Sequence, residues 1–283
     1  MTLPNFLIVG TQKAGTRWML NMLGQHPDIF MPSYEVHYFD RPDNLAKGPE
    51  WYATHFAGAR GQAAIGEKTP SYLMMEQGDP DARPRRIHEL LPAARLIAIL
   101  RNPVERAISA INHNIRVGRL PADVDLDRAV RRYIKSGKAL IRYGYYHQHL
   151  TSFRRFFDPA RMLVLIYEDD VVAQPLPTLR RVCTFLGVDP GFAFPDRDRR
   201  FNLSGTSPFG RKLARVLPLG PHMKARVVAR VESLLGIQSE KKRPSKGSLN
   251  RLYGVYAAEN AKLFELLGRE IPSWAKNDAY IIR

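Results

Sequence analysis

The sequence predicts an α/β fold of three layers, P-loop-like, with a central, mostly parallel sheet flanked by helices and a helical C-terminal part. Short, uniformly apolar runs alternate with amphipathic helical segments, and a glycine-bearing loop follows the first run. The 283 residues are enough for one large core. We therefore expect a single domain over residues 1–283, with a core of residues 1–187 and a basic helical part of residues 196–283.

The first strand, the loop after it and the start of the next helix have the features of an anion-binding site. A strand over residues 6–9 leads into a loop that starts at Gly10, and a helix begins at Thr16. Backbone N–H groups and the helix dipole together favour a negative charge at such a position. Lys13 and Arg17 add full positive charges. The expected ligand is therefore a phosphate or a group of similar shape.

This loop differs from the one that binds ATP or GTP with magnesium. Gly10 and Gly15 keep the spacing of a nucleotide triphosphate loop, but Thr16 stands where its lysine belongs. Arg17 occupies the position of the hydroxyl that holds Mg²⁺, and the lysine has moved inside the loop, to Lys13. The loop suits a phosphate-like group that side chains alone neutralise. An ATP- or GTP-dependent kinase is kept as an alternative.

Residues 33–40 are predicted to be extended, so that Glu35 and His37 share one face while Tyr34 and Tyr38 share the other. A glutamate and a histidine beside a phosphate-type site are candidates for a general base. An ordinary amphipathic strand with a solvated polar edge would show the same pattern. From the residues alone, the choice between these readings stays open.

A strand over residues 63–68 is expected to end before Pro70, which places Lys68 at its carboxyl end. Ligands gather at that end of the strands in open parallel sheets. A short aromatic-rich helix is predicted before this strand, over residues 49–58, and an amphipathic helix after it, over residues 80–91.

The clearest buried strand of the chain ends at Arg101, and Pro103 opens the next helix, residues 104–119. The apolar stripe of this helix leaves Arg106 and Ser109, together with Arg101, to face the ligand crevice. These groups add to the positive charge expected there.

Further along, a helix over residues 143–157 and a buried strand over 162–167 are predicted. The acids at 168–170 could suggest a metal site, but we favour a charge cluster ahead of the helix 175–187, where acids are stabilised. Cys183 is the only cysteine and lies in an apolar helical pattern, so we expect a buried, inert thiol and no internal disulfide.

Positive charge dominates the whole chain. It carries 43 lysines and arginines against 27 acids, for a net charge of +16. This balance favours polyanionic ligands and keeps a non-catalytic polyanion-binding protein as an alternative. No apolar run approaches the ~18 residues that span a bilayer, and no leader pattern precedes the first strand, so we expect a cytoplasmic protein.

The basic part after residue 196 contains a glycine- and proline-bearing segment, residues 241–248, which we expect to be a loop before a final helix over 249–267. Lys246 and Gly247 lie in this expected loop.

The motifs together resemble those of sulfotransferases that use 3′-phosphoadenosine 5′-phosphosulfate (PAPS), most closely the heparan sulfate (glycan) branch, as a soluble member of bacterial type. The stretch that resembles the 5′-phosphosulfate loop consists of Lys13, Ala14, Gly15, Thr16 and Arg17. The resemblance implies that these residues hold the phosphosulfate end of the donor.

Other motifs extend the resemblance. Glu35 matches the glutamate that serves as the base in glycan sulfotransferases, with His37 as the next candidate. Lys68, in Glu-Lys-Thr-Pro-Ser-Tyr, matches a lysine near the transferring sulfuryl group. Arg101 and Ser109 match the 3′-phosphate motif, and Lys246-Gly247 resembles a basic loop that covers the adenosine.

The resemblance implies in-line transfer of a sulfuryl group from PAPS to a hydroxyl or amine, leaving 3′-phosphoadenosine 5′-phosphate (PAP). Lys13 and Lys68 would stabilise charge on the bridging oxygen, and no metal is required. The basic part, residues 196–283, would complete the nucleotide and acceptor cleft. The acceptor would be a glycan, a lipid or a small metabolite, and no nucleic acid is expected as a partner.

Overall fold

The structure is a computed structural model, and the residues it describes are 1–121, 123–137, 139–197, 208–218, 223, 227–228, 230–231, 234–235 and 242–275. The chain forms two compact units. Unit 1 comprises residues 1–102, 146–201 and 266–268, and unit 2 comprises residues 103–145, 202–265 and 269–283. The basic residues at 199, 200, 224, 226 and 241 lie outside the described residues.

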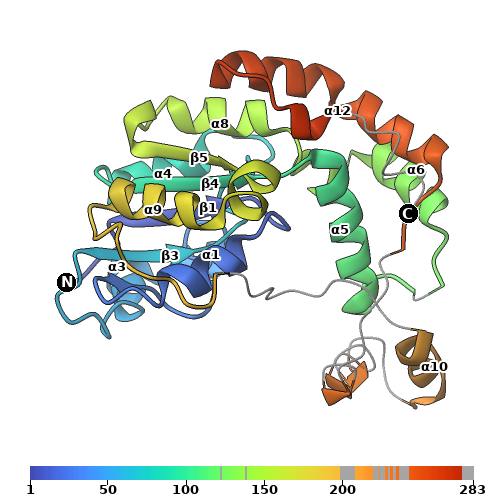
Figure 1. Ribbon diagram of the computed structural model, residues 1–283, viewed down its shortest axis with the longest axis horizontal. Helices are drawn as coiled ribbons and strands as arrows, with labels where there is room; N and C mark the ends of the chain where they lie inside the picture. Colours follow the sequence, from blue (N-terminus) through green and yellow to red (C-terminus); the bar gives the residue numbers. More distant parts are fainter. Residues whose placement is uncertain are drawn as a thin grey trace. The chain divides into compact units, whose positions relative to one another are not determined.

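Unit 1 is built on a five-stranded sheet in the order β2-β3-β1-β4-β5, in which every neighbouring pair is parallel (Figure 1). In chain order, the strands are β1 (Phe6–Gly10), β2 (Ile29–Phe30), β3 (Ala64–Lys68), β4 (Arg95–Leu100) and β5 (Met162–Ile166). The predicted α/β class with a parallel sheet is confirmed. Because all strands run in the same direction, their carboxyl ends meet at one edge of the sheet.

The strands form where the sequence is continuously apolar. All five residues of β1 are buried, as expected of a strand with both faces covered. Between β1 and β3 the packing is close, since a Cβ at Gly66 would lie 2.4 Å from the ring of Phe6. A glycine at this position lets the aromatic ring fill the space beside β3.

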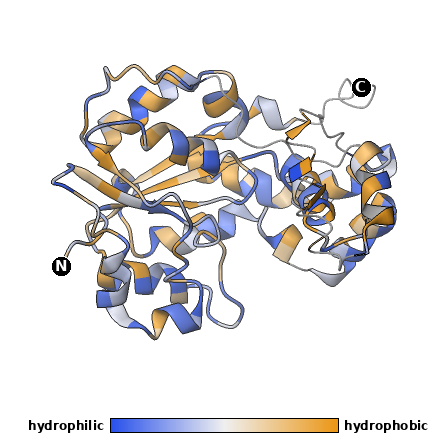
Figure 2. Cartoon of the chain, turned by 90° about the horizontal axis from the view of Figure 1, so that it is seen from below, coloured by the Kyte–Doolittle hydropathy of each residue, from blue (hydrophilic) through white to orange (hydrophobic). Residues whose placement is uncertain are grey.

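Helices flank the sheet on both sides, and Figure 2 shows the apolar strands between them. The helices of unit 1 are α1 (Thr16–Leu23), α2 (Pro42–Leu45), α3 (Gly48–Thr54), α4 (Ala82–Leu90), α8 (Tyr146–Arg154) and α9 (Pro175–Leu186), with a 3₁₀ turn at Pro159–Arg161 and a π-helical turn at Tyr167–Val172. α1 and α9 pack in one apolar core with Ile8, Ile97 and Leu165. Cys183 is fully buried in this core, and burial raises the pKa of its thiol to about 11, as expected of an inert cysteine.

Unit 2 is helical. Its elements are α5 (Pro103–Arg116), α6 (Leu126–Ser136), α7 (Ala139–Arg142), α10 (Pro208–Val216), most of α12 (Lys246–Leu267) and the 3₁₀ turn Pro272–Trp274. One apolar cluster joins α5, α6 and α7 to Leu249, Leu252 and Tyr256 of α12. The Tyr256 hydroxyl donates to the carbonyl of Ile141 at 3.1 Å, so a buried polar group is also satisfied across the cluster.

Three expectations about these elements were wrong. Arg106 does not face a crevice: it is fully buried in unit 2, where its guanidinium donates to the carbonyl of Leu140 and lies 5.8 Å from the Tyr143 ring. Lys246 and Gly247 belong to the first turn of α12 and not to a loop. Residues 33–40 are not extended throughout, because His37 has φ +57° and a turn follows it at residues 38–40. In the described part of the chain, no helix combines the length and apolar character required to cross a membrane.

Candidate functional site

The carboxyl ends of three neighbouring strands bring most of the predicted site residues to one edge of the sheet. Lys68 is the last residue of β3, the glycine loop follows β1, and Arg101 follows β4 directly. The register supports this placement, because Ile8 of β1 pairs with Lys68 on one side and Ile97 on the other.

The glycine loop has a backbone that few residues tolerate. Lys13 has φ +72° and Gly15 has φ +84°. A Cβ at Gly15 would lie 2.9 Å from the ring of Tyr167, and one at Gly10 would lie 2.6 Å from the Cβ of Leu73. Both glycines are thus required by space, and Gly15 also by its left-handed conformation.

The loop has the features of an anion cradle. Gly15 is the N-cap of α1, no side chain caps the first turn of that helix, and the turn contains no acid. Thr11 offers a buried hydroxyl that has no hydrogen-bond partner among the described residues. Lys13 is half-buried and Arg17 is exposed, so both charges are near the loop surface. The donor set therefore fits a phosphate-like group.

Arg101 is held against this loop. Its guanidinium donates to the carbonyl of Lys13 at 3.1 Å, and its Cζ lies 4.9 Å from the centre of the Tyr167 ring. Its Nε is 3.8 Å from Glu168, and its own carbonyl accepts from the Tyr146 hydroxyl at 2.8 Å. The two predicted donor-binding motifs, residues 13–17 and Arg101, therefore meet in unit 1.

A second cluster surrounds Glu35. Its two carboxylate oxygens contact different cations: Oε1 lies 2.5 Å from Lys68 Nζ, and Oε2 lies 3.2 Å from His37 Nε2. The other ring nitrogen of His37 is 3.0 Å from Asp40. The Ser71 hydroxyl donates to Asp40 in turn. The result is a chain of alternating charges that ends on Lys68.

The cluster fixes the charges of its members. Burial opposes the ionisation of Glu35, but the hydrogen bond from His37 and the charge of Lys68 outweigh it and lower the pKa of Glu35 to about 2. Hydrogen bonds to Asp40 and then to Glu35 raise the pKa of His37 to about 9. At neutral pH, Glu35 is thus ionised and His37 is protonated, so that Glu35 is the member of this pair able to accept a proton.

The backbone of this cluster is also unusual. Among the described residues, Lys13 and His37 are the two non-glycine residues with positive φ, at +72° and +57°. Such strain persists only where the surroundings enforce it, and it concentrates at functional sites. One strained residue lies in each cluster.

Two acids of these clusters were not predicted as site residues: Asp40, and Glu168, which was expected only as part of a charge cluster ahead of the helix at 175–187. Asp40, the partner of His37, lies only three residues beyond it, which is a usable signal. Glu168 accepts from the amide of Asn102 at 3.2 Å and faces Arg101. It follows the end of β5, at the same sheet edge as the other groups. Asp170 lies in the π-helical turn, where its carboxylate accepts from the Ile166 amide and from Arg181.

The remaining predicted residues belong to unit 2. Ser109 lies in α5 and is buried, whereas Lys246 and Gly247 lie at the start of α12 and are exposed. Their contribution to the site remains a prediction.

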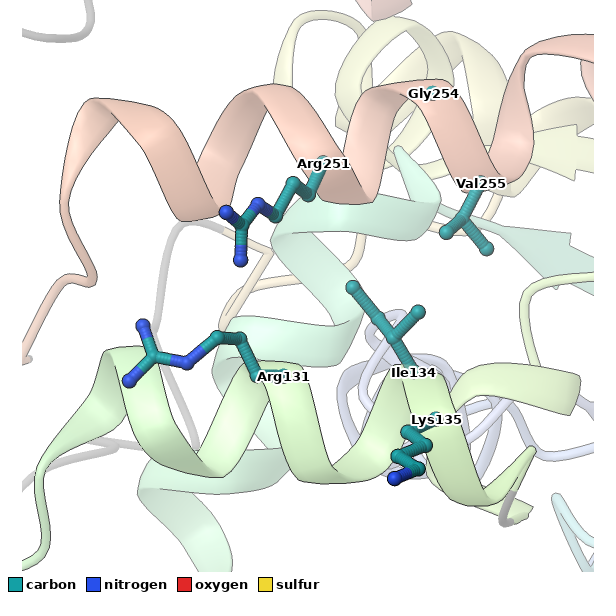
Figure 3. Close-up of a pocket in the computed structure, with 6 residues that line it drawn as sticks. All are labelled: Arg131, Ile134, Lys135, Arg251, Gly254 and Val255. Carbon is teal, nitrogen blue, oxygen red and sulfur yellow. The ribbon is translucent and has the colours of Figure 1, made fainter.

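Unit 2 also has an open groove of about 570 Å³ between α6 and α12 (Figure 3). Ile134 and Val255 project into the space between the two helices. The groove is lined by Arg131, Ile134, Lys135, Arg251, Gly254 and Val255. It includes none of the residues predicted for the site.

Comparisons with known proteins add to this geometry. The family model for the sulfotransferase domain matches residues 3–196. Heparan sulfate glucosamine 3-O-sulfotransferase 5 of Mus musculus is 31% identical over 202 residues, which make up 66% of this chain and 54% of the relative. The chain thus spans about half the length of this curated relative.

Solved structures share the fold. A sulfotransferase from Alicyclobacillus acidocaldarius, at 24% identity, superposes with a TM-score of 0.72 and covers 98% of this chain and 100% of its own. Mouse sulfotransferase SULT7A1, crystallised with PAP, has a TM-score of 0.54 at 15% identity and covers 94% of this chain and 87% of its own.

Proposed function

The chain belongs to the sulfotransferase domain family, as its motifs predicted, and from this premise we propose that it transfers the sulfuryl group of PAPS to a hydroxyl or amine of an acceptor. One observation carries the proposal. An anion cradle braced by Arg101 and a carboxylate held by Lys68 and His37 lie at the carboxyl ends of neighbouring strands of one sheet.

PAPS is the proposed donor substrate, and it supplies the activated sulfuryl group. The phosphosulfate end would be held by Lys13, Ala14, Gly15, Thr16 and Arg17. The free amides of the α1 N-terminus and the buried Thr11 hydroxyl support this assignment. Arg101 and Ser109 are proposed for the 3′-phosphate, with Lys246 and Gly247 over the adenosine. Binding the far phosphate would fix the sulfur for in-line attack.

Glu35 is the proposed base. It takes the proton of the acceptor group while the acceptor oxygen or nitrogen bonds to sulfur and the sulfur–oxygen bond to the donor phosphate breaks, which releases PAP. A carboxyl with a pKa of about 2 is a weak base. The proposal therefore requires Lys68 to move its charge from Glu35 to the transferring group, since loss of that charge raises the pKa of Glu35. His37 and Asp40 would keep Glu35 oriented.

The proposed acceptor is an acidic glycan. The curated relative's name states that it acts on the glucosamine of heparan sulfate, and a net charge of +16 favours an acidic partner. A hydroxylated lipid or a small metabolite is the competing choice. A cytoplasmic location is part of the proposal and is compatible with one buried, unpaired cysteine.

Calorimetric titration tests the donor half. We expect 3′,5′-adenosine bisphosphate to bind without magnesium and ATP with magnesium to bind weakly, and we expect Lys13→Ala to lose the first interaction. Transfer from labelled PAPS to a panel of acidic glycans, lipids and phenols then tests the reaction. Binding of ATP that depends on magnesium, without binding of the bisphosphate, would favour a kinase and overturn the proposal.

A further inference from the structure

Beneath the segment that carries Glu35, His37 and Asp40 lies a carboxyl group that the proposed reaction does not use. Glu67, the residue before Lys68 on β3, is fully buried. A buried carboxyl is costly unless hydrogen bonds satisfy it, so its contacts indicate what it does.

Glu67 is surrounded by hydrogen-bond donors. The hydroxyls of Tyr52 and Tyr72 each donate to its Oε1 at 2.8 Å, and the Thr69 hydroxyl donates to its Oε2 at 2.7 Å. The two oxygens thus accept from three hydroxyls on two separate segments of unit 1.

Two of these hydroxyls also contact the segment that bears the catalytic candidates. The Tyr72 oxygen accepts from the amides of Tyr38 at 2.8 Å and Phe39 at 3.4 Å, and the Thr69 oxygen accepts from the amide of His37 at 3.4 Å. Three consecutive amides, residues 37–39, thus donate to one buried cluster. These amides include that of His37, whose φ is +57°.

The direction of these hydrogen bonds follows from elementary chemistry. A backbone amide can only donate, so the Tyr72 and Thr69 oxygens must accept from the segment. Each hydroxyl has one proton, and that proton then points to Glu67. Burial and the nearby charge of Glu67 raise the pKa of Tyr72 well above its ordinary value, so it keeps the proton that it donates.

We propose that Glu67 is a positioning residue: by accepting the protons of Tyr72 and Thr69, it turns their lone pairs toward the amides of residues 37–39 and so holds Glu35 and His37 in place. This inference rests on the proposed function for its effect on turnover, but the structural part of it can be measured without activity. Lys68, the next residue, holds the Glu35 side chain, while Glu67 holds the backbone.

Glu67→Gln is the sharpest variant. Glutamine keeps the shape of the side chain but replaces one acceptor oxygen with a donor NH₂, so at least one hydroxyl must turn its proton away and lose an amide of the segment. We expect kcat to fall about 10²-fold, the scale of a 1 Å misplacement of a catalytic group. Affinity for 3′,5′-adenosine bisphosphate should not change.

The two tyrosines supply a matched pair. Both donate to the same oxygen of Glu67, but only Tyr72 also accepts from the segment amides in the described contacts. Tyr72→Phe should therefore lower kcat about tenfold or more, whereas Tyr52→Phe should change it by less than about threefold, since the hydrogen bond that it removes does not involve the segment amides. This pair keeps the test valid if Glu67→Gln does not fold.

Hydrogen exchange gives a readout that needs no activity. The amides of residues 38 and 39 should exchange at least about tenfold faster in Tyr72→Phe than in the unmodified protein or Tyr52→Phe, and at least one amide of residues 37–39 should do so in Glu67→Gln. An NMR titration of His37 should show its pKa falling from about 9 toward its ordinary 6.5 in Glu67→Gln and Tyr72→Phe, because that pKa depends on contacts with Asp40 and Glu35.

The outcomes separate the two hypotheses. If the unmodified protein transfers no sulfuryl group but exchange follows this order, the proposed function fails and the positioning role stands. If it is active and all three variants match it in kcat, exchange and His37 titration, the positioning role is overturned. Equal effects of Tyr52→Phe and Tyr72→Phe would also overturn it, since general loosening of the core would then explain both.

Discussion

At the residue scale, the position and the pKa of Glu35 are set by the two side chains that contact it, Lys68 and His37. Lys68 is almost entirely buried, with a side-chain exposure of 3%, whereas the Glu35 side chain is 38% exposed. The exposed side of Glu35 is left for an acceptor to approach.

Replacing Glu35 by glutamine tests its proposed role as the base. Glutamine keeps the shape but cannot take the acceptor proton, so turnover should fall by about 10²-fold or more while the fold is kept, as is typical for loss of a general base. Steady-state kinetics with labelled PAPS and a thermal unfolding curve measure both quantities. Turnover close to that of the unmodified protein would remove Glu35 from this role and leave His37 as the next candidate.

The pKa values of the pair predict how stability depends on pH. Because the pKa of His37 is raised from 6.5 to about 9, its contribution to stability is complete below pH 6.5 and is lost as the pH rises through 9. The contribution of Glu35, whose pKa falls from 4.5 to about 2, is complete above pH 4.5 and is lost as the pH falls through 2. Both contributions are therefore complete only between pH 4.5 and 6.5.

Denaturant unfolding of the protein and of His37→Ala checks this. The difference in unfolding free energy should be largest between pH 4.5 and 6.5 and should shrink as the pH passes 9. A difference that does not change over this range would show that the ionisation of His37 is not linked to folding.

Sequence reasoning reached Glu35 and His37 but for an incomplete reason. It placed them on one face of an extended segment, with Tyr34 and Tyr38 on the other. The side chains do meet, yet the backbone turns at His37, and Tyr34 is exposed while Tyr38 is buried. The role proposed for Glu67 could not be predicted, because it depends on three amides that only the folded chain brings to Thr69 and Tyr72.

At the scale of elements, the glycine loop determines where the charges lie. Gly15 ends the loop with φ +84°, and its missing side chain leaves room for the ring of Tyr167. That ring in turn lies beside Arg101. A substitution at Gly15 should therefore displace Tyr167 and with it Arg101, the residue proposed to bind the 3′-phosphate.

Gly15→Ala can be compared with a matched control. Gly61 also has a left-handed φ, +87°, but a Cβ there would meet nothing within 4 Å. Gly61→Ala should cost only the backbone strain, roughly 1 kcal/mol. Gly15→Ala should cost roughly 1–3 kcal/mol more through the clash with Tyr167, and it should weaken binding of 3′,5′-adenosine bisphosphate.

Denaturant unfolding and calorimetry measure these effects. In a Tyr167→Ala background, the extra cost of Gly15→Ala over Gly61→Ala should disappear, because the clashing ring is gone. If Gly15→Ala and Gly61→Ala are equally stable, a side chain at residue 15 does not clash with Tyr167, and the prediction is wrong.

Secondary structure was predictable wherever a pattern was long enough. The uniformly apolar runs of β1, β4 and β5 gave the parallel sheet, whereas β2 has two residues and leaves no periodic signal. The start of α12 was placed at Leu249 because its first turn, from Lys246, carries no apolar residue before that leucine. A helix can begin with polar residues that only its later turns anchor.

At the scale of the whole molecule, unit 2 is built from segments that lie far apart in the sequence. The family model ends at residue 196, but the core of unit 2 needs residues from both sides of that boundary. Leu252 is 1% exposed in this core. Leu252→Ala should therefore destabilise the protein by about 2–5 kcal/mol, the usual cost of removing a buried leucine.

A leucine of the same unit serves as the control. Leu234 is 79% exposed, so Leu234→Ala should change the unfolding free energy by less than about 0.5 kcal/mol. Denaturant unfolding monitored by tryptophan fluorescence gives both values. Equal effects of the two changes would contradict the core assigned to unit 2.

The net charge of +16 makes the acceptor testable through salt. If the acceptor is an acidic glycan, its KM should rise about tenfold or more between about 50 and 200 mM salt, because each contact with a cation competes with free ions. A neutral hydroxylated acceptor gives the control, and its KM should hardly change. Lys13→Ala distinguishes the proposed sulfotransferase from a protein that only binds polyanions. In a sulfotransferase, transfer should stop, while binding of the acidic glycan keeps most of its dependence on salt, since one of 43 basic side chains has been removed. If the KM for the glycan does not change with salt concentration, the acceptor is recognised by shape and apolar contact instead. That result would favour a lipid or a small molecule as the acceptor.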